Sequence, residues 1–143
     1  RQQKIGVELV DLDTLMSQSD FVSLHAPVTE ETRGMIGAHQ IGLMKPSAYF
    51  INTARAELVD EAALINALRE HKIAGAAVDV YLEEPLPFGH PWYSLDNVIC
   101  TPHIGGASKD VINHQSEMAI QAAIDFLEGR IPKHTINAIP KVG

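Results

Sequence analysis

The sequence predicts an α/β domain built on a parallel sheet, because short apolar runs alternate along it with segments of helical periodicity. Each run has the length and content typical of strands buried on both faces of a sheet. Each run also ends abruptly in polar residues. The runs are Phe21–Leu24 before His25, Ala48–Ile51 before Asn52, Ala74–Val78 before Asp79, and Asn97–Cys100 before Thr101. Periodicity alone does not separate such runs from short buried helices, so the segments between them decide.

Three segments have the pattern of short helices. Asp60 is a suitable N-cap, and apolar residues at helical spacing follow it as far as Leu68. A helix over residues 37–44 is expected to stop before Pro46, since a residue that precedes proline is pushed out of the α region. Another is expected over residues 12–17, capped by Asp11. Strands separated by helices of this size indicate βαβ units and a parallel sheet.

The longest helix is predicted near the C-terminus, over Ser108–Glu128. Its apolar residues recur at the spacing of one helix face, and Gly129 and Pro132 are expected to end it. The remaining residues, 131–143, are predicted to form an extended terminal segment.

Composition and charge narrow the class of protein. Apolar residues make up 45% of the chain and charged residues 20%, which is ordinary for a globular protein. The net charge of −7 argues against nucleic-acid partners, because these select surfaces rich in lysine and arginine. No apolar run approaches the ~20 residues of a membrane span, and the first residues contain no secretory apolar region. The single cysteine, Cys100, excludes an intramolecular disulfide, so we expect a soluble, cytoplasmic protein.

Polar residues follow all of the predicted strands. In an open parallel sheet, ligands bind outside the carboxyl ends of the strands. The strand ends bring His25, Thr53 with Arg55, Asp79 and His103 to that edge of the sheet. We therefore expect a ligand site there.

Each of these residue types also has an alternative role. His103 lies in a glycine-flanked loop, which can present it to a ligand or let it cap the following helix. Arg55 can bind a carboxylate through two parallel hydrogen bonds, although arginine is common at surfaces. Asp79 ends an apolar strand and needs a partner, which a ligand amide or a cap can supply. Glu83 and Glu84 are adjacent acids, one of which could support an imidazole as a general acid, or both could lie in a solvated loop.

Several familiar motifs are absent from the sequence. It contains no G-x-G-x-x-G dinucleotide fingerprint, no G-x-S-x-G elbow and no H-E-x-x-H pair. No two of the seven histidines lie two or four residues apart, so no metal site is predicted.

A series of motifs, in order and with nearly the usual spacing, resembles the D-isomer-specific 2-hydroxyacid dehydrogenases. The motifs are Asp20–Pro27, Glu31–Gly34, Met44–Pro46, Ile51–Arg55, Leu58–Glu61, Ala74–Val80, Glu84–Pro87 and Thr101–Gly106. The resemblance extends from about residue 7 to residue 129. It implies part of a Rossmann-type doubly wound parallel sheet with flanking helices and a long C-terminal crossover helix.

The resemblance also implies how the chain is divided. Residues 1–106 would be the second half of a dinucleotide-binding domain. Residues 107–143 would be a helix and tail that pack on a substrate domain outside this sequence. The chain would then be the C-terminal portion of one about twice as long. The residues that select the substrate, and NAD over NADP, are expected outside this portion.

The resemblance assigns roles to residues at the strand ends. Arg55 would bind the substrate carboxylate and polarise the 2-keto oxygen. His103 would protonate that oxygen in reduction and act as the base in oxidation. Glu84 would pair with His103 and keep it protonated over a wider pH range, and Asp79 would contact the nicotinamide carboxamide. The cofactor-binding set would be Arg55, Asp79 and His103 together with His25, Ala26, Pro27, Thr32, Thr53, Ala54, Gly105 and Gly106.

One residue departs from the family pattern. Ala56 follows Arg55 where the family usually has glycine. A backbone position that needs a close approach or a positive φ would then shift locally.

The predicted function is that of an NAD(P)-dependent oxidoreductase, with NAD favoured as cofactor. It would interconvert a small D-2-hydroxy acid and its 2-keto acid, as glyoxylate/hydroxypyruvate reductases and phosphoglycerate dehydrogenases do. A homodimer through the nucleotide-binding domain is expected. The alternatives are an NAD(H)-sensing, corepressor-like binding module and an inactive fragment of the enzyme. The trio of Arg55, Glu84 and His103 favours the enzyme, because a binding module does not need all three.

Overall fold

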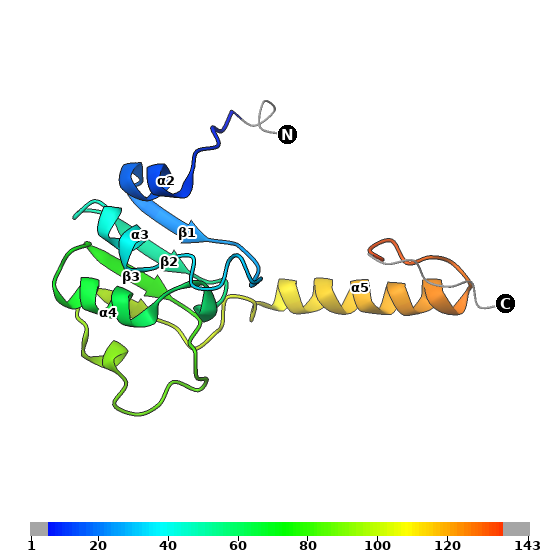
Figure 1. The fold of residues 1–143 in the computed structure, drawn as a ribbon. Coiled ribbons are helices and arrows are strands. Elements are labelled where there is room, and N and C mark those ends of the chain that lie inside the picture. The colour runs from blue at the N-terminus through cyan, green and yellow to red at the C-terminus, as the bar shows by residue number, and fades with distance from the viewer. Residues whose placement is uncertain (1–5, 136–143) are drawn as a thin grey trace. The chain divides into compact units, whose positions relative to one another are not determined.

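The computed structural model describes residues 6–135 and has two compact units, Arg1–His103 and Ile104–Gly143. The first unit contains a parallel sheet whose strands follow one another in chain order (Figure 1). The strands are β1 (Phe21–Leu24), β2 (Tyr49–Asn52), β3 (Gly75–Val78) and β4 (Val98–Cys100). All strand pairs are parallel, which confirms the predicted α/β class.

The carboxyl ends of the four strands are in register. Leu24 is paired with Asn52, Asn52 with Val78, and Val78 with Cys100. The loops that follow the strands therefore begin along one line at one edge of the sheet. This register is what brings residues distant in sequence to a common site.

Short helices precede or connect the strands. They are α2 (Leu12–Gln18), α3 (Ala38–Leu43) and α4 (Glu61–Arg69), with the 3-10 helices η1 (Ala56–Leu58) and η2 (Pro91–Ser94). Asp11 and Asp60 cap α2 and α4 as predicted, since their carboxylates accept the N–H of Thr14 at 2.8 Å and of Ala63 at 3.0 Å. The connection between β3 and β4 contains η2 in place of an α-helix.

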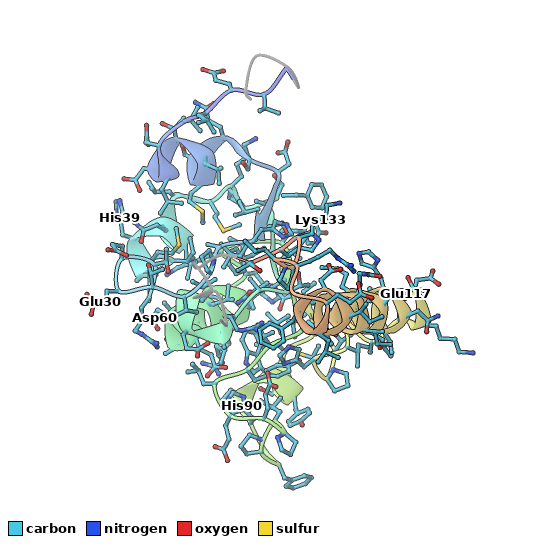
Figure 2. All side chains as sticks on the ribbon, turned by 90° about the vertical axis from the view of Figure 1, so that its right-hand side faces the viewer. Glu30, His39, Asp60, His90, Glu117 and Lys133 are labelled. Carbon is cyan, nitrogen blue, oxygen red and sulfur yellow. The ribbon has the colours of Figure 1, made fainter. Side chains whose placement is uncertain are left out.

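One face of the sheet is covered by these helices and forms the core. Phe50 of β2 is fully buried, together with Met16 of α2 and Leu64 and Leu68 of α4. Polar contacts at the rim join the helices to one another. His39 of α3, for example, lies 3.0 Å from Asp13 of α2 between Nε2 and Oδ2 (Figure 2).

The opposite face of the sheet is open in the first unit. Phe21, Tyr49 and Ile99 are 67%, 44% and 68% exposed, and the rings of Phe21 and Tyr49 stack with centroids 5.5 Å apart. The prediction that these strands are buried on both faces is therefore wrong for this unit. The physical reason is that the described helices of the unit all pack against the other face.

The second unit is built on one long helix, α5 (Lys109–Leu127). Ser108, predicted as the first residue of the helix, is instead its N-cap, because its hydroxyl accepts the N–H of Val111 at 3.2 Å, and Gly129 follows the helix with a φ of 72°. No described helix is long and apolar enough to cross a membrane.

The predicted extended tail is wrong for the residues that are described. Pro132–Thr135 form a turn, closed by the N–H of Thr135 bonding to the carbonyl of Pro132 at 3.1 Å. The rest of the predicted tail lies outside the described residues. The expected division of the chain into domains after residue 106 stays a prediction. Along the chain, the first compact unit ends at His103 and the second begins at Ile104.

Candidate active site

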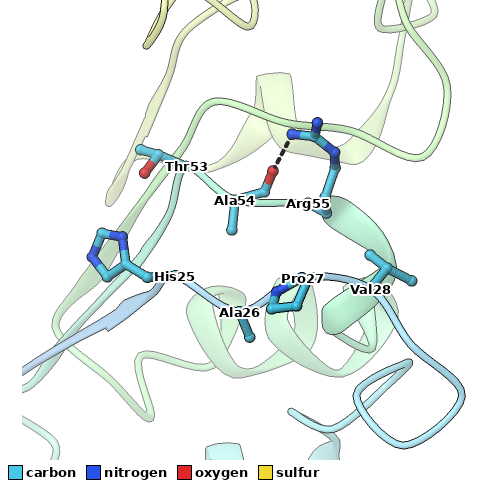
Figure 3. A pocket seen from close by; sticks show the side chains of 7 residues that line it. All are labelled: His25, Ala26, Pro27, Val28, Thr53, Ala54 and Arg55. Atoms are coloured by element: carbon cyan, nitrogen blue, oxygen red, sulfur yellow. Dashed lines mark hydrogen bonds between the residues drawn. The ribbon is translucent and has the colours of Figure 1, made fainter. Parts of the chain in front are cut away.

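A cavity of about 650 Å³ opens at the carboxyl ends of β1 and β2 (Figure 3). It is lined by His25, Ala26, Pro27, Val28, Thr53, Ala54 and Arg55. Six of these residues were predicted to bind the cofactor, and the structure brings them together. The ring of His25 is held at the cavity by Ser23, whose hydroxyl lies 2.9 Å from Nε2.

Thr32, also predicted to bind the cofactor, is not part of this lining. Its hydroxyl donates to the carbonyl of Pro27 at 2.7 Å and accepts the N–H of Thr29 at 2.7 Å. These bonds hold the loop after β1, whose residue Pro27 lines the cavity.

A second cavity, of about 280 Å³, lies beside the first. It is lined by Arg55, Ala56, Glu57, Val80, Tyr81, Leu82, Glu84 and His103. The predicted catalytic residues Arg55, Glu84 and His103 therefore share one cavity. Arg55 lines both cavities, so its side chain lies at the boundary between them.

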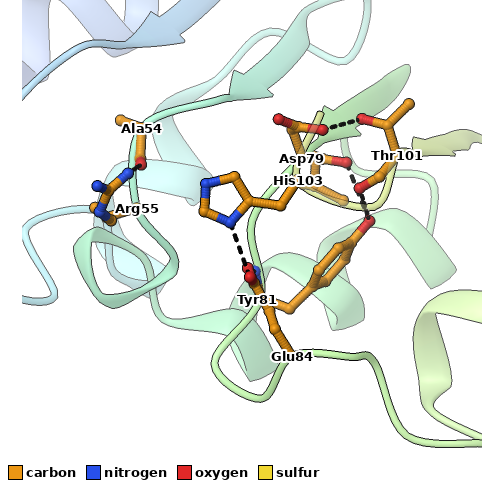
Figure 4. A network of polar contacts seen from close by, with 8 residues as sticks. Ala54, Arg55, Asp79, Tyr81, Glu84, Thr101 and His103 are labelled. Carbon is orange, nitrogen blue, oxygen red and sulfur yellow. Dashed lines mark hydrogen bonds and ion pairs between the residues drawn. The ribbon is translucent and has the colours of Figure 1, made fainter. Parts of the chain in front are cut away.

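His103 and Glu84 form a directly bonded pair in this cavity. The imidazole Nδ1 lies 2.8 Å from Glu84 Oε2, and the N–H of Tyr81 donates to Glu84 Oε1 at 2.9 Å. The Tyr81 N–H, and next the imidazole, hold the pKa of the Glu84 carboxyl below its ordinary value of 4.5. With Nδ1 engaged, Nε2 is the nitrogen that can exchange a proton with a ligand. Figure 4 shows the ring between Glu84 and Arg55.

The backbone of His103 is unusual. Its φ is 53°, in the left-handed region that residues other than glycine rarely adopt. The N–H of His103 donates to the carbonyl of Thr101 at 3.0 Å, which closes a tight turn after β4. The tight turn therefore fixes the backbone position of His103, and with it the Cα from which the imidazole extends, at the edge of the sheet.

Asp79 and Thr101 form a second polar pair, at the ends of β3 and β4. Asp79 is only 4% exposed, and the Thr101 hydroxyl donates to its Oδ1 at 2.5 Å. The Tyr81 hydroxyl lies 3.0 Å from the carbonyl oxygen of Thr101 and 3.1 Å from that of Val78 (Figure 4). Burial raises the pKa of Tyr81 well above its ordinary value, so this hydroxyl stays protonated as a donor.

Arg55 extends from the loop after β2 and is exposed. Its Nη1 donates to the carbonyl of Ala54 at 2.7 Å, a contact that an incoming carboxylate can replace. Ala56, which departs from the family pattern, begins η1 with its methyl group buried. The described residues other than glycine with a positive φ are His71 and His103, so Ala56 is accommodated without the left-handed backbone considered above.

Gly105 and Gly106 belong to the second unit, so their predicted role in binding the cofactor stays a prediction. Asn52, Tyr81 and Thr101, whose hydrogen bonds support the site, had not been predicted as site residues. Asn52 and Thr101 directly end or follow apolar strands, as Asp79 does, and that signal could have indicated them. Tyr81 has no such signal, because its hydroxyl bonds to the backbone carbonyls of Val78 and Thr101, which no residue pattern marks. Among the described residues, no group of three His, Cys, Asp or Glu side chains could hold a metal ion.

The fold and the site together define a dinucleotide-binding α/β domain, with its ligand cavities at the carboxyl edge of a parallel sheet. The chain belongs to the family described as D-isomer specific 2-hydroxyacid dehydrogenase, NAD binding domain, whose model matches residues 1–105. The predicted family and the predicted class of cofactor are thereby confirmed.

Similar proteins include enzymes and a solved complex. Glyoxylate reductase of Thermococcus litoralis is 45% identical over 136 residues, which are 95% of this chain and 41% of that protein. Glyoxylate/hydroxypyruvate reductase B of Citrobacter koseri is 43% identical over 136 residues, 95% of this chain and 42% of that protein. The NAD complexed form of a D-isomer specific 2-hydroxyacid dehydrogenase from Lactobacillus delbrueckii ssp. bulgaricus matches with a TM-score of 0.80 and 33% identity, over 89% of this chain and 43% of that one. The chain thus spans about two-fifths of the length of these relatives.

Proposed function

We propose that this chain is part of an NAD(P)-dependent oxidoreductase that interconverts a small D-2-hydroxy acid and its 2-keto acid. The observation that carries the proposal is the sharing of one cavity by Arg55, Glu84 and His103. A guanidinium, an imidazole and a supporting carboxylate are the groups that reduction of a 2-keto acid requires from a protein. Glyoxylate and hydroxypyruvate are the first candidate substrates, because similar proteins are named for them.

Arg55 binds the substrate in this proposal. Its planar guanidinium takes the carboxylate through two parallel hydrogen bonds and replaces its present contact with the Ala54 carbonyl. The same positive charge polarises the neighbouring 2-keto oxygen. Because Arg55 borders both cavities, the bound carboxylate lies close to the cofactor side of the site.

His103 transfers the proton. In reduction, its Nε2 gives a proton to the 2-keto oxygen while carbon 2 gains a hydride, which yields the 2-hydroxy acid. In oxidation, the same nitrogen takes the proton back. Glu84 holds Nδ1, so it fixes the orientation of the ring and favours its protonated form.

The residues present fit a nicotinamide cofactor, which supplies or accepts the hydride when bound. The 650 Å³ cavity offers the Thr53–Arg55 loop and the His25–Val28 loop as walls. The carboxylate of Asp79, fixed by Thr101, is an acceptor suited to the carboxamide N–H. NAD is the favoured form of the cofactor, as expected from the sequence.

Steady-state oxidation of NADH by the complete protein tests the proposal, with glyoxylate, hydroxypyruvate and phosphohydroxypyruvate as substrates. Turnover of at least one of them is the expected result. Arg55→Gln should abolish most of that turnover, whereas the control Arg69→Gln, on the exposed side of α4, should not. Binding of NADH without turnover of any substrate would contradict the proposed enzyme and favour the alternative, a cofactor-sensing binding module.

Two further parts of the proposal concern the whole protein. We expect a homodimer through the nucleotide-binding domain, which light scattering on the purified protein measures directly. We also expect a cytoplasmic location, in keeping with the single cysteine, which cell fractionation tests.

A further inference from the structure

The loop that carries Arg55 is tied to one buried side chain, that of Asn52. This residue ends β2 and is only 3% exposed. Its Nδ2 donates to the carbonyl of Arg55 at 3.0 Å, and its Oδ1 accepts the N–H of Ala54 at 3.0 Å. The nitrogen and the oxygen of the Asn52 side-chain amide therefore each bond to the backbone of this loop, one at Arg55 and the other at Ala54.

Asn52 is itself held firmly by the sheet. Its backbone is paired with Leu24 of β1 on one side and with Val78 of β3 on the other. Its carbonyl also accepts the N–H of Asp79 at 3.0 Å. The Asn52 amide therefore links the loop of residues 53–55, which is half-buried or exposed, to the hydrogen-bonded end of the sheet.

We infer that Asn52 positions Arg55 for binding of the substrate carboxylate. The inference rests on the function proposed above. The guanidinium is exposed on a long side chain, so the place of the Arg55 backbone decides which cavity wall it can reach. Asn52 is thus a positioning residue, which acts through Arg55 without touching the substrate.

The residue type fits this role closely. An asparagine amide has a donor and an acceptor on one short side chain, and this loop uses both. An ionised aspartate has only acceptors, so it can still receive the Ala54 N–H but faces the Arg55 carbonyl with a second oxygen. Asn52→Asp therefore removes the bond to the Arg55 carbonyl and keeps the bond from the Ala54 N–H, with almost no change in side-chain shape.

Kinetics of Asn52→Asp in the complete protein test the inference. Loss of the bond to Arg55, with two acceptors left facing each other, should raise the KM for the 2-keto acid by about tenfold or more. The dissociation constant for NADH should stay unchanged, because the bond to Ala54 on the cofactor side is kept. If the aspartate variant does not fold, Asn52→Ala removes both bonds without a buried charge and should raise the KM for the 2-keto acid as well.

Asn97→Asp is the matched control. Asn97 is half-buried before β4, at the opposite end of the strands, and its Nδ2 donates to the carbonyl of Leu68 at 3.1 Å. The same change there should lower the thermal stability and leave the KM for the 2-keto acid as it is. A purely structural role of Asn52 predicts that both variants behave alike, and that outcome overturns the inference.

A double variant tests whether Asn52 acts through Arg55. Binding of oxamate, an unreactive analogue of 2-keto acids, to the NADH complex is the readout. Asn52→Asp should weaken oxamate binding in the wild-type background and should have no further effect beside Arg55→Ala. An undiminished effect beside Arg55→Ala contradicts the inference. A wild-type protein that neither reduces 2-keto acids nor binds oxamate overturns the proposed function as well, so the two failures are distinguishable.

Discussion

The Thr101 hydroxyl donates to Oδ1 of Asp79 across 2.5 Å, and this bond joins the ends of β3 and β4 at the ligand edge. Asp79 is 4% exposed, so its carboxylate depends on protein partners for much of its stabilisation. A hydroxyl donating to a carboxylate is among the stronger hydrogen bonds in proteins. The pair therefore fixes the carboxyl group of Asp79 in a defined place at the carboxyl edge of the sheet.

Thr101→Val should destabilise the protein and weaken cofactor binding. Valine has nearly the same shape but leaves the buried carboxylate without this donor, at a cost of about 1–3 kcal/mol. Urea unfolding gives the stability, and a fluorescence titration gives the dissociation constant for NADH. Thr101→Ser keeps the hydroxyl and is the control. Equal stability of the valine and serine variants would contradict this view of the pair.

His103→Gln should lower the rate of 2-keto acid reduction by about 10²-fold or more, because the general acid is lost. NADH binding should survive, since the side chain keeps its size and remains polar. His71→Gln is an informative control, because His71 has a similar left-handed backbone, with a φ of 50° against 53° for His103, but lines neither cavity. A normal rate for His103→Gln would remove His103 from the mechanism.

Glu84→Gln should narrow the pH range of reduction at its alkaline side. The pKa of the Glu84 carboxyl is lowered from 4.5, first by the Tyr81 N–H and then by His103, so the carboxylate is charged throughout the neutral range. Its support of the imidazole is therefore present above pH 4.5 and is lost only as the pH falls through the lowered pKa.

Glutamine removes that charge, so reduction by the variant should decline at a lower pH than reduction by the wild type. Rates measured across the neutral and alkaline pH range check this outcome. Glu83→Gln, a change in the exposed neighbouring carboxylate, should leave the profile in place. Identical profiles for the two variants would argue against the role of the Glu84 pair.

The sheet could be predicted because each strand is a short apolar run with an abrupt polar end. Phe21–Leu24 is found as predicted, and the other strands differ by about one residue at either end. The open face could not be predicted in the same way. Phe21 and Tyr49 have the residue types of a buried strand, and only the helices that pack against a face decide whether it is covered.

The site was predictable where side chains follow strand ends. Arg55, Asp79 and His103 were indicated by that rule, and the structure brings Arg55 and His103 to one cavity with Glu84. The supporting contacts were not predictable from spacing. Asn52 and Tyr81 act on backbone groups, which every residue has, so no residue pattern marks their partners. The chemical roles of these residues stay predictions for the experiments described here.

Trp92→Phe should lower the free energy of unfolding by about 1–3 kcal/mol, because it removes one part-buried hydrogen bond to a carboxylate. Trp92 lies in η2 and is 3% exposed, and its Nε1 donates to Oε1 of Glu61 at the start of α4 across 2.7 Å. This bond ties the long connection that carries Glu84 to the helical layer. Glu61→Gln keeps an acceptor oxygen for the indole and should cost less. Unfolding by urea compares the two variants, and a phenylalanine variant as stable as the wild type would mean that the ring alone anchors this connection.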